Sequence, residues 1–173
     1  MLCVIEILIN QYFCDIVKHR EIGVWNEMNY RYPEVLYQTD MYDDDWSIQC
    51  VIEAFQEHPC EFEYLCAELL SKKYGYEVGI TNAVKDGGYD LVCYAGNQVQ
   101  MLVECKCYDI QNRVGRPALQ KLVGANALLH VPQLCFITTS EYTSDAMEYA
   151  ARIGIQLYNG HDVEHWMRCY FQQ

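Results

Sequence analysis

One stretch of the sequence, residues 86–106, constrains the fold of this chain more than any other. It opens with Asp-Gly-Gly-Tyr-Asp, continues with the aromatic and β-branched residues 91–94, and reaches the turn-forming pair Gly96 and Asn97. A second apolar run, residues 99–103, follows and ends in Glu-Cys-Lys. Two such runs separated by turn residues predict a β-hairpin, so we expect two antiparallel strands here.

The hairpin brings charged side chains together. Paired residues in an antiparallel hairpin keep a constant sum of residue numbers, so a turn near Asn97 places Asp90 roughly opposite Glu104. Side chains alternate along a strand, which puts Glu104 and Lys106 on one face and Cys105 on the other. Two carboxylates and an ammonium group should therefore converge at the end of this hairpin.

Such a cluster is typical of a metal-dependent site. Two acids that lie close together repel each other unless a cation separates them, and Mg²⁺ is bound by one or two carboxylates while it keeps several waters. A bound metal lowers the pKa of a water ligand and polarises a phosphoryl oxygen, and Lys106 could orient the attacking water. The alternative is an exposed strand with an ordinary surface ion pair, which would contribute little to stability.

The length and composition describe a folded domain rather than a disordered or membrane chain. Of 173 residues, 51% are apolar, and no apolar run approaches the roughly 20 residues that span a bilayer. The apolar start, residues 1–9, contains Glu6 and lacks the features of a signal peptide. The ten cysteines are scattered, so we expect reduced, mostly buried thiols in a cytoplasmic protein.

The net charge of −12 argues against a general nucleic-acid binder. Its distribution is uneven, because residues 1–60 hold eleven acidic and three basic residues, a balance of −8. Residues 61–173 hold thirteen acidic and nine basic residues, a balance of −4. Several acids of the second part belong to the predicted metal site, so we expect any DNA binding to be weak, metal-dependent and salt-sensitive.

The sequence divides near Pro59. Residues 1–58 form an acidic N-terminal segment to which we assign no role, although residues 48–57 could form a short helix. Residues 59–173 form the second part. It begins with a helix that ends at Gly75 and whose inner face carries Phe62, Leu65, Cys66, Leu69 and Leu70.

Glu63 lies in the first turns of that helix, beside its apolar stripe. Near the hairpin it could join the metal site or bind its outer shell. As an ordinary glutamate of a first turn it would only interact favourably with the helix dipole. The sequence leaves both interpretations open.

Strands and helices alternate after the hairpin. The expected strands cover residues 76–81, 133–139 and 155–158, and the expected helices cover 117–129, 145–152 and 161–170. Strands that alternate with helices after an initial hairpin predict an α/β fold, with a mixed central β-sheet flanked by helices.

A few polar residues of this part could contact a phosphate. Arg113, Arg116 and Lys121 form a small basic cluster near the hairpin, and Gln120 could hold a water or a phosphate or could simply be solvated. Three hydroxyl side chains at a predicted strand end are further candidates, although capping and turn formation would explain them equally well. These three residues are Thr138, Thr139 and Ser140.

A set of short motifs resembles a known family. In order, the motifs are Phe62-Glu63-x-Leu65, Gly75-Tyr76-x-Val78, Asp86-Gly87-Gly88-x-Asp90, Glu104-x-Lys106, Gln120-x-Leu122-x-Gly124-Ala125, Phe136-x-Thr138-Thr139-Ser140, Ala146 and Leu157-x-Asn159-Gly160. Their order and spacing resemble the Mrr-like restriction endonuclease domain of the PD-(D/E)xK nuclease superfamily. The resemblance covers about residues 61–168.

The resemblance implies a restriction-endonuclease-like core of α-β-β-β-α-β type and metal-dependent hydrolysis of DNA phosphodiester bonds, in defence against foreign or modified DNA. It implies that Asp90 and Glu104 hold Mg²⁺, for which Mn²⁺ can substitute, and that Lys106 assists the nucleophilic water. Glu63 and Gln120 would complete the site. DNA is the expected partner, no membrane contact is expected, and a homodimer stays open.

The chain departs from the family pattern at two positions. Many Mrr-like members carry Gln where this chain has Glu104, and Tyr89 replaces a common Ile. Two alternatives to a DNA endonuclease remain at this stage. One is a catalytically inactive nucleic-acid or protein-binding module on the same fold, and the other is a nuclease for branched DNA or RNA.

Overall fold

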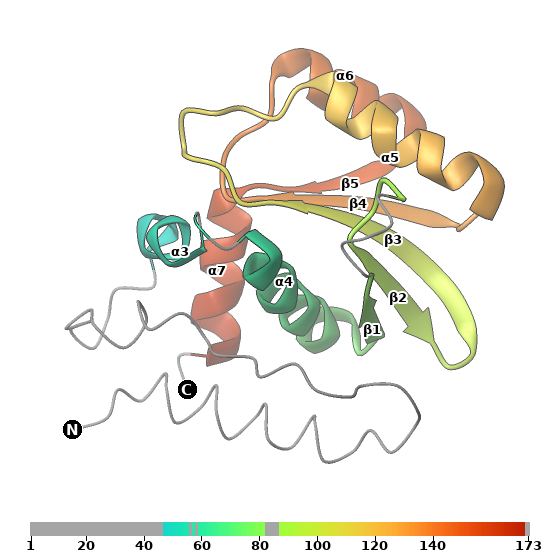
Figure 1. Cartoon of the computed structure of the whole chain (residues 1–173), viewed down its shortest axis with the longest axis horizontal. Helices are drawn as coiled ribbons and strands as arrows, with labels where there is room; N and C mark the ends of the chain where they lie inside the picture. The colour runs from blue at the N-terminus through green and yellow to red at the C-terminus, as the bar shows by residue number, and fades with distance from the viewer. Residues whose placement is uncertain (1–46, 56, 58, 82–86, 172–173) are drawn as a thin grey trace. The chain divides into compact units, whose positions relative to one another are not determined.

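Five strands form one mixed sheet whose spatial order follows the sequence (Figure 1). The strands are β1 (Glu77–Ile80), β2 (Leu91–Ala95), β3 (Gln98–Lys106), β4 (Gln133–Thr138) and β5 (Ile155–Tyr158). The first three are antiparallel, and β4 and β5 each pair in parallel with the preceding strand after a helical crossover. The predicted α/β fold with a mixed sheet is confirmed.

The computed structural model describes residues 47–55, 57, 59–81 and 87–171. These residues belong to one unit that spans residues 46–172. The acidic segment up to residue 46 and the motif residue Asp86 lie outside the described residues. No helix in the described part of the chain has the length and apolar character needed to cross a membrane.

Helices cover both faces of the sheet (Figure 1). On one face lie α5 (Arg116–Leu129) and α6 (Ser144–Ile153), and on the other lie α3 (Ile48–Phe55), α4 (Pro59–Tyr74) and α7 (Gly160–Phe171). The predicted elements downstream of Pro59 are all present within one or two residues of their expected ends. The α-β-β-β-α-β core corresponds to α4, the first three strands, α5 and β4.

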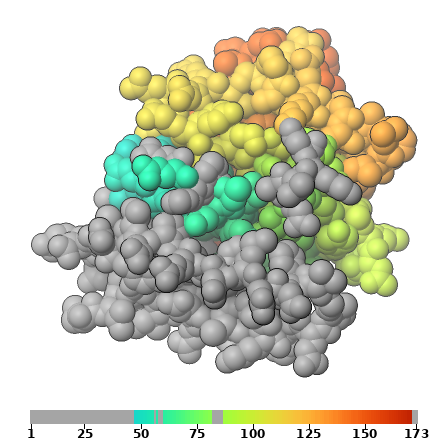
Figure 2. All heavy atoms as spheres, viewed as in Figure 1, coloured from blue at the N-terminus to red at the C-terminus, as the bar shows by residue number. Residues whose placement is uncertain are grey.

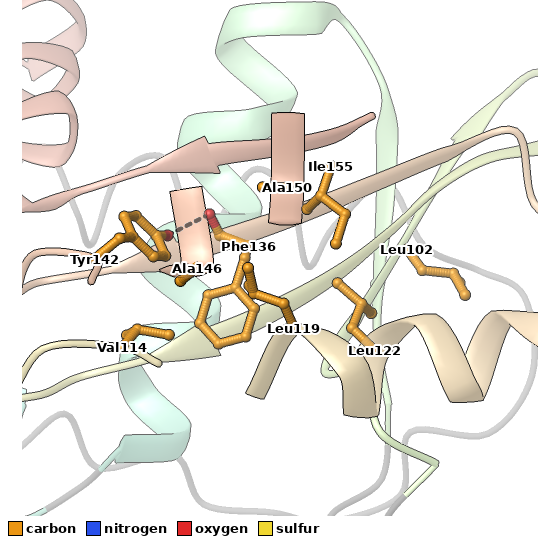
Figure 3. Packing of buried hydrophobic residues seen from close by; sticks show 9 residues of the cluster. All are labelled: Leu102, Val114, Leu119, Leu122, Phe136, Tyr142, Ala146, Ala150 and Ile155. Carbon is orange, nitrogen blue, oxygen red and sulfur yellow. Dashed lines mark hydrogen bonds between the residues drawn. The ribbon is translucent and has the colours of Figure 1, made fainter. Parts of the chain in front are cut away.

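The α5/α6 face holds a continuous apolar core (Figure 3). Leu102 of β3 and Phe136 of β4 pack against Leu119 and Leu122 of α5. The Tyr142 hydroxyl donates a hydrogen bond to the carbonyl oxygen of Phe136 at 2.8 Å, so this buried polar atom has a partner. This core fixes the parallel half of the sheet and the crossover helices that border it.

Helix α3 belongs to the same unit as the sheet. The sequence interpretation placed it in the N-terminal segment, but α3 packs against both α4 and α7. The backbone N–H of Ile48 donates to Glu164 Oε2 at 3.0 Å. Gly160 lies so close to the Thr139 carbonyl and to Ile48 that a side chain there would collide with both. The folded unit therefore begins upstream of Pro59.

The β2–β3 hairpin has the predicted register at its open end, but the register shifts by one residue between Cys93 and Tyr94, so that nearer the turn Tyr94 pairs with Val99 and Ala95 with Gln98. Leu91 pairs with Val103 and Cys93 with Met101, which gives the constant sum that places Asp90 opposite Glu104. Gly96, in the two-residue turn, has a φ of 59°, a conformation that glycine adopts without strain. The start of β2 and the end of β3 thus meet at one edge of the structure.

Candidate active site

Asp90 is held in place by the strands on both sides. Its backbone N–H donates to the Val103 carbonyl at 2.8 Å, and its own carbonyl accepts from the Thr81 N–H at 2.8 Å. Its side-chain Oδ2 accepts a hydrogen bond from the Cys105 N–H at 2.8 Å. The Asp90 carboxylate is therefore a fixed part of the sheet's hydrogen-bond pattern rather than a free side chain.

The Lys106 side chain lies beside the Asp90 carboxylate and contacts two further oxygen atoms. Its Nζ lies 2.7 Å from Glu104 Oε1, 2.9 Å from the Cys105 carbonyl oxygen and 3.4 Å from Asp90 Oδ2. We call these three oxygens and the ammonium group the oxygen nest. The predicted convergence of two carboxylates and a lysine is present, and it stands on rigid strand ends.

Burial and charge oppose each other in the oxygen nest. The Glu104 side chain is only 5% exposed, and burial raises its pKa although the hydrogen bond from Lys106 lowers it. Burial acts against the charged form of Lys106, but the hydrogen bond that Lys106 donates to Glu104 and the charge of Asp90 outweigh it and raise its pKa. The Lys106 ammonium thus offsets only part of the cost of burying the Glu104 carboxylate.

Glu63 on α4 belongs to the same electrostatic cluster. The pKa of Glu63 is raised to about 7, mainly by burial and also by the charges of Asp90 and Glu104, while the charge of Lys106 opposes this rise. Glu63 thus lies close enough to the other charged groups to affect them electrostatically, and its role in the site stays a prediction. Three acids against one lysine leave this cluster short of positive charge.

The chemistry of these donors fits a hard divalent cation. Carboxylates of Asp90 and Glu104 and the carbonyl of Cys105 are oxygen ligands of the kind that Mg²⁺ prefers. Within the described residues no group of three or more His, Cys, Asp or Glu side chains is placed to hold a metal ion. Two carboxylates, a carbonyl and waters would therefore have to supply the coordination. The Cys105 side chain is buried, and burial together with the neighbouring Cys66 raises the pKa of its thiol.

Gly88 explains why a glycine stands two residues before Asp90. It has a φ of 81°, and a Cβ there would lie 3.1 Å from the Ala125 Cβ and 3.4 Å from the Lys121 carbonyl oxygen. The loop that carries Asp90 is therefore seated directly on α5. Lys121 of that helix lowers the pKa of Glu104, so α5 also adds positive charge near the nest.

The other candidate residues, which lie on α5 or in the loop that precedes it, make no direct contact with the oxygen nest among the described interactions. Gln120 is exposed, and in the described part of the chain it makes no hydrogen bond to Asp90, Glu104 or Lys106. Arg113 is exposed, whereas Arg116 lies 3.4 Å from Asp145 and covers the Tyr149 ring at 4.7 Å. The role of Gln120 in the site stays a prediction.

The three hydroxyl residues at the end of β4 are buried, with exposures of 2% or less. The Thr138 hydroxyl donates to the Lys106 carbonyl at 2.9 Å, the Thr139 hydroxyl to the Tyr108 carbonyl at 2.6 Å, and the Ser140 hydroxyl to the Asn112 carbonyl at 2.8 Å. In this conformation they hold the chain that leaves β3. The structure thus favours the structural role over contact with a phosphate.

One group of the site carries no sequence signal, and one cysteine lies close enough for the charges of the site to affect its pKa. The Cys105 carbonyl belongs to the site through its backbone, which any residue would supply. Cys60 is exposed near the start of α4, and burial together with the charges of Glu63 and Asp90 raises the pKa of its thiol. A lone cysteine among ten gives no pattern from which this position could be found.

Comparison with known proteins gives a consistent family. A family model described as restriction endonuclease, of the Mrr catalytic type, matches residues 55–167. The type IV methyl-directed restriction enzyme EcoKMrr of Escherichia coli (strain K12) is 32% identical over 118 residues, which cover 65% of this chain and 38% of that protein. The chain thus matches well under half of the length of that relative.

Solved structures share the fold. The restriction endonuclease MspJI, in complex with a 27-mer oligonucleotide, aligns with a TM-score of 0.57 at 16% identity, over 70% of this chain and 30% of that chain. The DNA modification-dependent restriction endonuclease AspBHI aligns with a TM-score of 0.57 at 18% identity, over 86% of this chain and 40% of that one. At these identities the likeness describes the fold.

Proposed function

Because the chain belongs to the restriction endonuclease family, in its Mrr branch, we propose that it is a metal-dependent endonuclease that hydrolyses phosphodiester bonds in DNA. We further propose that it acts in defence against foreign or modified DNA. The observation that best supports the proposal is the oxygen nest, in which Lys106 Nζ lies 2.7 Å from Glu104 Oε1 and 3.4 Å from Asp90 Oδ2. An ammonium group held by three oxygens marks a place where a harder cation fits.

Asp90 and Glu104 would hold Mg²⁺, with Mn²⁺ as a substitute. A bound Mg²⁺ would polarise the scissile phosphate and lower the pKa of a water ligand. Every ligand oxygen of the nest lies on or next to the two hairpin strands, so little reorganisation would be needed.

Lys106 and Glu63 have complementary parts in this proposal. The Lys106 ammonium stays protonated, since its acidic neighbours raise its pKa, and it can donate hydrogen bonds to the attacking water or to a phosphate oxygen. Glu63, with a pKa raised to about 7, is suited to exchange a proton near neutral pH. Gln120 would orient water from the exposed side of α5.

The proposal is tested by cleavage of supercoiled plasmid DNA in Mg²⁺, in Mn²⁺ and in excess chelator. We expect cleavage by the wild type with either metal and none with chelator. Asp90→Ala, Glu104→Ala and Lys106→Ala should each remove cleavage while circular dichroism and thermal unfolding still report a folded protein. Leu128→Ala, at an 89% exposed position of α5, is the matched control.

Two outcomes would contradict the proposal. The first is cleavage by all three site variants at the wild-type rate. The second is tight DNA binding by the wild type without divalent metal and without turnover, which would favour a binding module on the same fold. Running RNA and branched DNA beside the plasmid identifies the substrate class of the same chemistry.

A further inference from the structure

The loop between β3 and α5, residues 107–115, leaves the site directly after Lys106. It runs out beyond the ends of the strands before it returns to α5 (Figure 1). Tyr108 and Ile110 in this loop are 39% and 46% exposed. In the described part of the chain, the other large apolar side chains with comparable exposure lie on α5 and α6, away from Lys106 in the sequence.

The start of the loop is fixed by a buried hydroxyl. Thr139 Oγ1 accepts from the Tyr108 N–H at 2.7 Å and donates to the Tyr108 carbonyl at 2.6 Å. One buried side chain thus satisfies both backbone groups of an exposed residue. Tyr108 is therefore presented from a rigid backbone, although its ring faces water.

The rest of the loop is fixed as well. The Gln111 N–H donates to the Asp109 carboxylate at 3.0 Å, and the Ser140 hydroxyl donates to the Asn112 carbonyl at 2.8 Å. Val114 is 1% exposed, and its N–H donates to the Glu141 carbonyl at 2.8 Å. A loop anchored at both ends loses little conformational entropy when a partner binds to it.

The charge of this part of the chain is unusual. Residues 106–121 contain four basic residues and one acid, in a chain with twelve basic residues and a net charge of −12. The single acid, Asp109, accepts a hydrogen bond from the loop's own backbone. Within this stretch Lys106 is paired with Glu104 and Asp90, and Arg116 with Asp145, so the exposed Arg113 is the basic group of the loop to which a polyanion would be drawn.

We propose that the β3–α5 loop is the edge of the protein that contacts duplex DNA beside the scissile phosphate. Tyr108 and Ile110 pack against sugars and base edges in a groove, and Arg113 contacts a backbone phosphate. This inference rests on the proposed nuclease function. It adds a binding surface that the oxygen nest does not contain.

Two observations favour DNA over another occupant. The loop is continuous with Lys106, and Tyr108 follows only two residues later. A DNA strand bound at the oxygen nest would therefore lie close to Tyr108. Apolar and aromatic side chains next to basic ones suit a duplex, because they contact sugars and bases while the basic groups contact phosphates. Figure 2 shows this segment, coloured yellow, at the molecular surface above α3.

The test measures binding of a fluorescent 30-base-pair duplex by the full chain, with Ca²⁺ in place of Mg²⁺ to slow hydrolysis. We expect the double variant Tyr108→Ala/Ile110→Ala to bind about tenfold more weakly, with an unchanged slope of log affinity against log salt. Arg113→Ala should instead reduce that slope by about one phosphate contact. Leu128→Ala should bind like the wild type.

Cleavage kinetics in Mg²⁺ add a second readout. The double variant should show a raised KM with a kcat close to that of the wild type, because the loop binds DNA and does not touch the reacting atoms. Tyr108→Phe should restore the affinity that Tyr108→Ala loses, since the ring makes the contact. Thermal unfolding of each variant confirms that these exposed substitutions leave the fold intact.

The outcomes separate this inference from the proposed function. If the wild type binds and cuts duplex DNA but the loop variants do so equally well, the inference is overturned and the nuclease stands. If the wild type neither binds nor cuts DNA, both fail. A salt slope that changes in the double variant and not in Arg113→Ala would also overturn the assignment of roles within the loop.

Discussion

Two lysines of this protein are partly buried in opposite surroundings. Lys106 lies among oxygens of Glu104, Cys105 and Asp90. Lys73, near the end of α4, lies among aromatic rings, with its Nζ 4.6 Å from the ring centroid of Trp166 and 5.5 Å from that of Tyr158. Both are held by attraction to negative charge density, but the partners of Lys106 include carboxylates that carry a net negative charge, whereas the rings around Lys73 carry none at neutral pH.

The difference explains which lysine can take part in chemistry. Aromatic rings attract a cation without carrying net charge, so the cluster around Lys73 has no shortage of positive charge. The oxygen nest does have one, because burial and mutual repulsion raise the pKa of Glu104 and of Glu63 beside a single ammonium group. The Lys73 cluster is a structural link between α4, β5 and α7. The oxygen nest, by contrast, would be stabilised by an additional cation.

The largest expected difference between the two lysines is in activity. Lys106→Ala should reduce the rate of DNA cleavage by about 10² to 10⁴, since it removes a charge that stabilises the transition state. Lys73→Ala should leave the rate within about twofold of the wild type. Single-turnover cleavage assays with both proteins measure this directly, and equal losses in the two variants would end the contrast.

The next effect is stabilisation by metal. At a Mg²⁺ concentration about 100 times its dissociation constant, binding should stabilise the folded wild type by about 2.7 kcal/mol. Asp90→Asn keeps an oxygen that can accept from the Cys105 N–H but loses the charge, so we expect it to lose most of this gain. Urea unfolding with and without Mg²⁺ tests the difference, and the Lys73→Ala protein, in which the nest is intact, should keep the full gain.

The pH dependence of the free energy of unfolding should reveal the cost of ionising the partly buried Glu63 carboxyl group. Its pKa rises from the ordinary value of 4.5 to about 7 on folding, so the folded state binds more protons between these values. Without metal, stability should therefore fall as the pH rises from about 4.5 to about 7, and change little from this group above that range. Glu63→Gln should remove this loss and be about 2 kcal/mol more stable than the wild type at pH 8, allowing for partial exposure of the side chain.

Urea unfolding at pH 4.5 and pH 8 separates the two proteins. A Glu63→Gln variant that gained nothing at pH 8 would mean that Glu63 lies in a more solvated place than the structure gives it. Saturating Mg²⁺ should shrink the difference, because added positive charge favours the ionised carboxylate.

The smallest expected effect concerns the stability provided by Lys73. Replacing Lys73 by Met keeps much of the apolar stem but removes the charge over the Tyr74, Tyr158 and Trp166 rings. We expect a loss of about 1 kcal/mol, the scale of a partly buried cation–π contact. Thermal unfolding measures it, with Lys72→Met as the neighbouring control, because Lys72 is an i, i+4 partner of Glu68 rather than of these rings.

Much of this structure follows from simple patterns in the sequence. The turn at Gly96 and Asn97 and the alternation of side chains predict the hairpin and the approach of Asp90 to Glu104 and Lys106. The exact register at the site also depends on the one-residue shift between Cys93 and Tyr94, which the sequence does not indicate. The predicted ends of the helices and strands agree with the observed ends to within one or two residues. The reason is that residues such as Pro59, Gly75 and Gly96 favour the ends of helices and strands. These features are local, and the residues that determine them are close together in the chain.

The remainder depends on contacts that no pattern encodes. From the sequence, the hydroxyls of Thr138 to Ser140 could donate equally well to a phosphate or to a backbone carbonyl. They donate to carbonyls because the β3–α5 loop passes beside them in the folded chain. Likewise, the pKa of Glu63 depends on how deeply α4 packs beside the strands. The Cys105 carbonyl leaves no trace in the side-chain sequence at all.

One feature of Asp90 limits which changes the chain can tolerate. Its carboxylate also accepts a hydrogen bond from the Cys105 N–H, so it stands in for a main-chain acceptor just before β2 begins. In a related protein without catalytic activity, replacement of Lys106 would leave no backbone N–H unpaired. Replacement of Asp90 by a residue that cannot accept a hydrogen bond would leave the Cys105 N–H without its partner. Inactive relatives should therefore tend to keep Asp or Asn at this position after the lysine has gone.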